Sequence, residues 1–155
     1  MAGSLLIDAN LLVLWAVGSV SPSLIPRHKR LANTYRESDH QLLVDFLGVY
    51  DGLVVTPNAL TEAANIAKQI SEPARGQISE FIAEIAEKAK EIYVPSATAV
   101  GRSEYRFLGL SDAAILEVQD VHLLTNDLDL YVSWGGQGKT CFNFTHLREA
   151  AGITS

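Results

Sequence analysis

The sequence has a single cysteine, Cys141, among its 155 residues. One thiol excludes a disulfide within the chain and a cysteine-based zinc site, so we expect a reducing, cytoplasmic environment. Basic residues are also few, because 12 Lys and Arg stand against 18 Asp and Glu and give a net charge of −6. A chain that bound nucleic acid through its overall charge would be basic, so any such binding must rely on a local concentration of basic residues.

Long hydrophobic runs are missing as well. The best candidate, residues 11–20, is well short of the roughly 20 apolar residues that a membrane span requires. No Lys or Arg precedes this run and Asp8 interrupts its approach, which argues against a signal peptide. We therefore expect no membrane partner. Apolar residues make up 48% and charged residues 19% of the chain, as is typical of a folded protein, and we predict one domain over residues 1–155.

Short apolar runs alternate with helical patterns along the chain. We predict strands at 5–7, 53–57, 91–94, 121–125 and 140–144. Helices are predicted at 11–17, 59–70, 72–92, 112–118, 127–134 and 146–150, with another after a cap at Ser38 or Asp39; Asn58 and Ser111 are expected to cap two of them. This alternation predicts an α/β fold with three layers, α/β/α, around a central, mostly parallel sheet.

Acidic residues recur where the predicted strands end or the next helices begin. Asp8 ends the first strand; Asp127 and Asp129 follow the strand at 121–125; Glu62 and Asp112 lie in the first turns of helices. In open α/β sheets the carboxyl ends of the strands meet at one edge, so these side chains are expected near that edge. An acid in a first helical turn also has an ordinary explanation in the helix dipole. Asp8 is harder to explain, since a buried carboxylate is costly unless it is paired or bound to metal.

Three to five carboxylates at one edge would repel one another, and a hard divalent cation would explain their presence. Mg²⁺ and Mn²⁺ prefer oxygen ligands, commonly a few carboxylates with water and substrate phosphate. Such a cation lowers the pKa of a bound water and stabilises charge on a phosphodiester. The pattern therefore predicts phosphodiester hydrolysis by metal-activated water.

Four segments together resemble the acidic blocks of the PIN domain family. They are "LLIDAN", "VVTPNALTEAANIA", "LGLSDAAILE" and "HLLTNDLDLY", which occur in the family's order between Leu5 and about Leu147. The resemblance implies a Mg²⁺- or Mn²⁺-dependent endoribonuclease of VapC-like type. It also implies an RNA substrate and, for a toxin of a toxin–antitoxin pair, an antitoxin protein and a second copy of the chain as partners.

The resemblance also assigns roles to single residues. Asp8, Glu62, Asp112 and Asp127 would be the catalytic, metal-binding acids. Asp129 would share or replace the role of Asp127 as a metal ligand. Thr125 would assist with its hydroxyl, and the spacing can aim Asn10 and Asn65 at the same site, which makes these three the supporting residues.

A long loop is predicted at about residues 19–38, because Pro22, Pro26 and several serines occur there. It contains the run Arg27-His28-Lys29-Arg30. One interpretation is a solvated surface loop; the other is an arm that grips phosphates, with Arg27, Lys29 and Arg30 as RNA-binding residues. The length of this segment departs from compact toxins of the family.

Other functions are weighed against the nuclease. A haloacid dehalogenase-type phosphatase also begins with a strand-end aspartate, but it requires a second aspartate where this chain has Asn10. A non-catalytic PIN-fold module that binds RNA or protein is the main alternative. The run at 135–140 lacks P-loop spacing and precedes a strand, so we predict a turn there.

Overall fold

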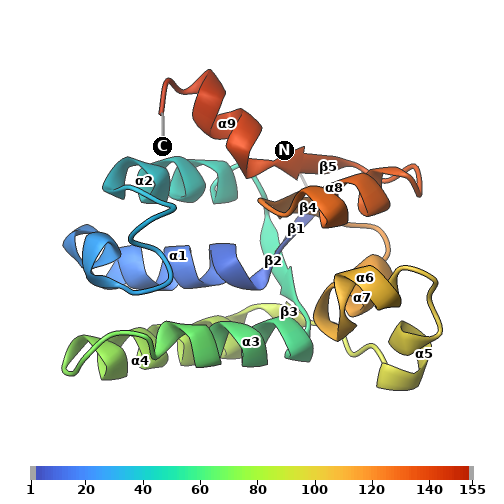
Figure 1. The fold of residues 1–155 in the computed structure, drawn as a ribbon, viewed down its shortest axis with the longest axis horizontal. Helices are drawn as coiled ribbons and strands as arrows, with labels where there is room; N and C mark the ends of the chain where they lie inside the picture. The colour runs from blue at the N-terminus through green and yellow to red at the C-terminus, as the bar shows by residue number, and fades with distance from the viewer. Residues whose placement is uncertain (1–2, 154–155) are drawn as a thin grey trace.

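The computed structural model describes residues 3–153, which form a parallel sheet covered by helices on both faces (Figure 1). The strands are β1 (Ser4–Ile7), β2 (Gly52–Val55), β3 (Lys90–Glu91), β4 (His122–Thr125) and β5 (Cys141–Asn143). Their order across the five-stranded sheet is β3-β2-β1-β4-β5, and all four neighbouring pairs are parallel. The predicted α/β/α fold class is therefore confirmed.

Alternating side chains along β1 divide the core between the two faces of the sheet. Leu5 and Ile7 pack with α1 (Ala9–Val20), α2 (Glu37–Leu47), α3 (Pro57–Ala67), α4 (Ala74–Lys88) and α9 (Phe144–Ala150). Leu6 points the other way and packs with α7 (Leu110–Leu116) and α8 (Leu128–Gly135). The short helices α5 (Ser96–Val100) and α6 (Tyr105–Leu108) lie beside α7 (Figure 1).

The strand order reverses beside β1. The chain adds β2 and β3 on one side of β1 and then β4 and β5 on the other. Ile7 is in register with Leu124, so Asp8, the residue after β1, follows beside Thr125, the last residue of β4. Such a reversal is where open α/β sheets form their ligand sites, outside the carboxyl ends of the strands.

The apolar run after Asp8 forms α1, which is almost entirely buried against the sheet and its covering helices. Gly18 lets α2 approach closely, because a Cβ atom added there would lie 2.2 Å from Cδ2 of His40. Within residues 3–153, no helix has the length and apolar character needed to cross a membrane.

The loop predicted at 19–38 is wrong for about half of its residues, and the stretch 28–36 does lie outside helices and strands. α1 continues to Val20, a 3₁₀ helix η1 occupies Pro22–Arg27, and α2 begins at Glu37. The reason lies in buried side chains that anchor the segment: Leu24, Ile25, His28, Leu31 and Tyr35. The proline and serine content suggested irregular chain, but these anchors order it.

Two caps and several boundaries also differ from prediction. Thr56 rather than Asn58 caps α3, since its Oγ1 accepts a hydrogen bond from the Ala59 amide at 3.2 Å. Gly109, at φ 87°, precedes α7 in place of a Ser111 cap. The predicted helices at 59–70 and 72–92 end earlier, at Ala67 and Lys88. Helices α5 and α6 occupy a stretch for which the sequence predicted no element.

Candidate active site

Asp8 lies at the point where β1 ends and α1 begins. The residue is 6% exposed and its side chain caps α1, because Oδ1 accepts a hydrogen bond from the Leu11 amide at 3.2 Å. Its second oxygen, Oδ2, accepts a hydrogen bond from Oγ1 of Thr125, the last residue of β4. Neighbouring parallel strands thus deliver the carboxylate and its hydroxyl partner to one place.

Burial raises the pKa of the Asp8 carboxyl from 3.8 to about 6. The hydrogen bonds from Thr125 and Leu11 oppose this rise, since they stabilise the ionised form, whereas the negative charge of Asp127 adds to it. A nearby cation would therefore stabilise the ionised form of Asp8 and lower its pKa.

Asp127 reaches the same place from the start of α8. It is the N-cap of that helix, with Oδ1 accepting from the Leu130 amide at 3.0 Å. Its own amide donates to Oγ1 of Thr125 at 3.0 Å, so the Thr125 hydroxyl contacts both Asp8 and Asp127. Asp129 lies exposed in the first turn of α8, and Asp127 is the acid of the two that acts on Asp8.

Asp112, in the first turn of α7, links the acids electrostatically. The pKa of its carboxyl is raised from 3.8 to about 7, first by burial and then by the negative charges of Asp8, Asp127 and Glu62. Two of the carboxylates lie on α3 and α7 and two are the N-caps of α1 and α8, so they come from places far apart in sequence. The four acids predicted from the sequence are therefore near enough to affect a common group.

Glu62 approaches from α3 and is exposed, as is Asn65 one turn later on the same helix. Both line a cavity of about 770 Å³ that lies between the first half of α3, the segment after β3 and the start of α7. Ser111, the neighbour of Asp112, lines the same cavity. The cavity thus opens beside the acids on the α3 side.

The carboxylates influence one another, but their side chains do not form a ready-made metal-binding group. Among residues 3–153, no three His, Cys, Asp or Glu side chains stand together as a metal-binding group. The donor set nevertheless suits a hard cation, since it consists of carboxylate oxygens, and the negative charges of neighbouring acids add to the raised pKa of Asp8 and of Asp112. Glu62 is exposed, so its side chain has room to turn toward such an ion, whereas Asp127 is exposed but held through Oδ1 by the Leu130 amide.

A second cavity, of about 240 Å³, is lined by Asp8 itself. Asn10 and Arg30 line it together with Asp127, and Nη1 of Arg30 donates to Oδ1 of Asn10 at 3.2 Å. Sequence reasoning missed three further lining residues, Thr34, Tyr35 and Asn126, and the side chains of the last two hydrogen-bond at 3.1 Å. Asn126 stands between Thr125 and Asp127 in sequence, which was a usable signal; nothing in the sequence indicated Tyr35.

The three predicted RNA-binding residues are exposed but not equivalent. Arg30 lines the smaller cavity beside Asp8, whereas Arg27 is at the end of η1. Lys29 is fixed through its backbone, since its amide donates to the Gln69 carbonyl at 3.0 Å. Arg30 is thus the basic residue that the structure brings to the acids.

Buried His28 orders this basic segment. Its Nε2 donates to the Ala67 carbonyl at the end of α3 at 3.3 Å, and its Nδ1 accepts from the Arg30 amide at 3.2 Å. This pattern requires a neutral ring, and burial lowers the pKa of His28 accordingly. The histidine therefore positions Arg30, a role that sequence reasoning did not foresee.

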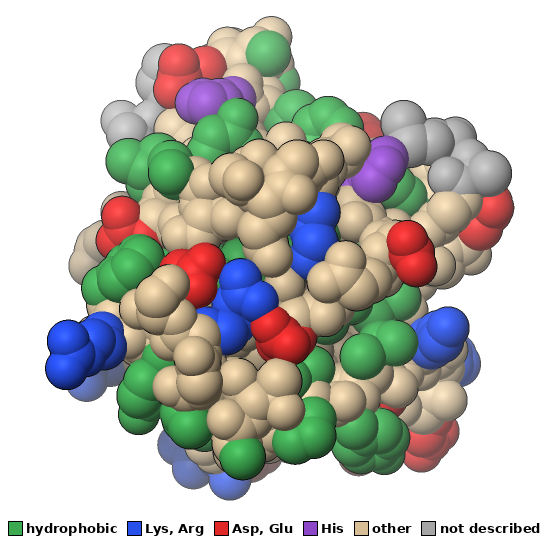
Figure 2. All heavy atoms as spheres, turned by 90° about the vertical axis from the view of Figure 1, so that its right-hand side faces the viewer, with side chains coloured by type: hydrophobic (Ala, Val, Ile, Leu, Met, Phe, Trp, Pro, Cys, Tyr) green, Lys and Arg blue, Asp and Glu red, His purple; other side chains and the backbone are tan. Residues whose placement is uncertain are grey.

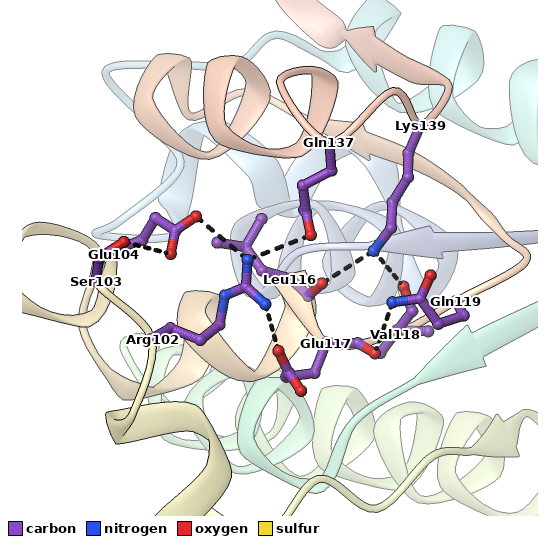
Figure 3. Close-up of polar contacts among 9 residues, drawn as sticks. All are labelled: Arg102, Ser103, Glu104, Leu116, Glu117, Val118, Gln119, Gln137 and Lys139. Carbon is purple, nitrogen blue, oxygen red and sulfur yellow. Dashed lines mark hydrogen bonds and ion pairs between the residues drawn. The ribbon is translucent and has the colours of Figure 1, made fainter.

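A polar network supports the far end of α7. Nζ of Lys139 donates to the carbonyls of Leu116 and Val118, at 2.9 and 2.8 Å (Figure 3). It also lies over the Trp134 ring, 4.4 Å from the ring centroid. Arg102 pairs with Glu104 and Glu117 beside it (Figure 3). Figure 2 shows the face of the molecule that lies on the right in Figure 1, and basic and acidic side chains lie side by side near its middle. These contacts hold the helix that carries Asp112.

No protein-family model matches the chain, and a search of curated proteins finds no match either. The function is therefore inferred from the residues of this chain.

Proposed function

We propose that the chain is a Mg²⁺- or Mn²⁺-dependent endoribonuclease of the PIN type. The observation that carries the proposal is the common effect of Asp8, Asp127 and Glu62 on the pKa of Asp112. Carboxylates from separate elements affect one another at the carboxyl-end edge of a parallel sheet, beside the reversal of strand order. Perturbed carboxyl groups of this kind are typical of functional sites.

Each of these residues has a separate role in the proposed reaction. Asp8, Asp112, Asp127 and Glu62 would hold the ion, and Thr125 orients the Asp8 carboxylate by donating to Oδ2. A bound Mg²⁺ or Mn²⁺ would supply a water of lowered pKa and positive charge for the phosphodiester. Arg30 offers a cation to a neighbouring phosphate from the smaller cavity.

The test is cleavage of single-stranded and structured RNA by the purified protein. We expect cleavage only with Mg²⁺ or Mn²⁺, and its loss with EDTA or in Asp8→Asn. Glu62→Gln should lower the rate by at least about tenfold, whereas Glu87→Gln, on the exposed side of α4, is the matched control. Cleavage that survives EDTA and Asp8→Asn would refute the metal mechanism, and RNA binding without cleavage would favour the non-catalytic module.

The toxin role is a finer part of the proposal. It is tested by the gene neighbourhood, where a toxin should have a small adjacent reading frame whose product begins with a DNA-binding segment. Co-expression with that product should suppress the RNA cleavage. A nuclease without such a neighbour would act outside a toxin–antitoxin pair.

A further inference from the structure

The larger cavity, next to Glu62, extends well beyond the acidic residues. Its volume of about 770 Å³ extends from Glu62 and Asn65 on α3 past Tyr93 and Ser96 to the start of α7. In Figure 1 the first turn of α3 and the helices α5 and α7 border the same region, at the lower right. A group bound here would lie directly beside the carboxylates of Asp8, Glu62, Asp112 and Asp127, which we call the acid edge.

The cavity walls are suited to a neutral, flat group. The lining residues that the structure describes include no lysine or arginine, so a phosphate would find no counter-charge there. Asn58 and Asn65 offer amides that both donate and accept hydrogen bonds, while Val94 and Leu110 offer apolar surface. Nucleobases combine a flat apolar face with polar edges of this kind.

Tyr93 supplies an uncovered aromatic ring at this cavity. Its residue surface is 76% exposed, although exposing a large aromatic ring to water is unfavourable. Its hydroxyl donates to Oε1 of Glu91 at 3.1 Å, which ties the ring to the end of β3. An exposed ring held in place beside a cavity is the arrangement on which unpaired bases stack.

We propose that this cavity binds one unpaired nucleobase of the RNA substrate, stacked on Tyr93 and hydrogen-bonded by Asn58 or Asn65. The inference rests on the proposed function and names the substrate class more narrowly: the RNA must be single-stranded where it meets this cavity. Glu62 belongs both to the cavity wall and to the acid edge, so the base belongs to a nucleotide next to the hydrolysed bond.

The experiment measures kcat and KM on a short single-stranded RNA and on versions with one abasic nucleotide on either side of the mapped cleavage point. We expect one abasic position to lower kcat/KM about 5- to 150-fold, the factor that corresponds to usual base–aromatic stacking. Tyr93→Ala should lower it by a similar factor on the intact RNA, and the abasic change should then cost less than in the unmodified protein, because the stacking contact is already lost. Tyr93→Phe keeps the ring and should stay close to the unmodified protein.

Phe107→Ala is the matched control, since Phe107 is a 62% exposed aromatic on α6 outside the cavity lining. Equal losses in Tyr93→Ala and Phe107→Ala, or independent effects of Tyr93→Ala and the abasic change, would overturn the base site while cleavage by the unmodified protein upholds the proposed function. If the unmodified protein cleaves no RNA with Mg²⁺ or Mn²⁺, the proposed function fails, and the base site with it.

Discussion

The hydroxyl of Thr125 donates a hydrogen bond to Asp8 across a sequence separation of 117 residues. The bond joins the ends of β1 and β4, the two strands between which the sheet reverses its order. The same Oγ1 accepts from the Asp127 amide, so one side chain aligns two of the acids. Thr125 therefore positions the site without needing to contact substrate.

Removal of the Thr125 hydroxyl should change the acidity of Asp8. In Thr125→Val the carboxylate loses a donor that lowers its pKa, so we expect that pKa to rise above its present value of about 6. An NMR titration of the Asp8 carboxyl in the metal-free protein with EDTA measures this pKa, and the titration profile should move to higher pH. Thr125→Ser keeps the hydroxyl and is the control; identical profiles for the two variants would argue against this role.

Replacement of Asp112 should stabilise the metal-free protein. The folded pKa of about 7 lies above the ordinary 3.8, so the ionised carboxyl opposes folding at high pH and this penalty disappears as pH falls below the folded pKa. Asp112→Asn should thus gain roughly 1 kcal/mol or more in the free energy of unfolding at pH 8 with EDTA, and much less near pH 4. Urea denaturation at the two pH values measures the difference.

Asp129→Asn is the comparison for that experiment, because Asp129 is exposed at the start of α8. Its substitution should leave the free energy of unfolding nearly unchanged at both pH values. Equal stabilisation by both substitutions would mean that general negative charge, rather than the acid edge, is responsible.

Divalent cations should stabilise the folded protein by binding to the carboxylates of the acid edge. An ion that binds the folded chain alone raises stability by RT ln(1 + [L]/Kd), or about 2.7 kcal/mol at one hundred times Kd. We expect Mg²⁺ or Mn²⁺ to raise Tm in the unmodified protein, and the rise to be largely lost in Asp112→Asn and Asp8→Asn. An equal Tm rise in all three proteins would place the ion elsewhere.

The sequence predicted the sheet well because the signals for it are local. Buried parallel strands are short apolar runs, and Asp8 and Asp127 sit directly where such runs end. These local patterns alone therefore assign the acids to one edge of the sheet. How near the acids lie to one another depends on long-range register, such as Ile7 beside Leu124, which no local pattern contains.

The segment between α1 and α2 shows what local patterns miss. His28 reads as part of a basic run, yet its partners, Ala67 and Arg30, give it a buried structural role. Tyr35 comes to the site only because this segment folds back over α1. Pro22 and Pro26 suggested a loop, although a proline is compatible with the 3₁₀ helix found there.

Buried His28 should make stability depend on pH. Its pKa is lowered in the folded state, so the unfolded chain takes up the proton first and stability falls as pH drops below the ordinary value of 6.5. His28→Gln should lose roughly 1–3 kcal/mol at pH 7.5 through its broken hydrogen bonds, and this deficit should shrink toward pH 5.5. Chemical denaturation of both proteins across this range measures the deficit; in exposed His146→Gln it should be absent.

A double-mutant cycle should show how the buried ion pair between Asp39 and Arg148 affects the free energy of unfolding. Nε of Arg148 donates to Oδ1 of Asp39 at 2.7 Å, with side chains 8% and 0% exposed, and Nη2 donates to the Thr34 carbonyl at 3.0 Å. Arg148→Met leaves the Asp39 charge buried without its partner, so we expect a loss of about 3–5 kcal/mol in the free energy of unfolding.

Asp39→Asn removes that charge while Oδ1 of the new amide can still accept from the Arg36 amide, which now donates to Asp39 at 2.7 Å. The double variant Asp39→Asn/Arg148→Met should therefore be more stable than Arg148→Met alone, as urea denaturation would measure. If the second substitution instead adds its own full loss, the buried charge is not what destabilises Arg148→Met. The packing of Arg148 against the Tyr35 ring, 5.6 Å away, would then account for the loss and would connect α9 to the cavity beside Asp8.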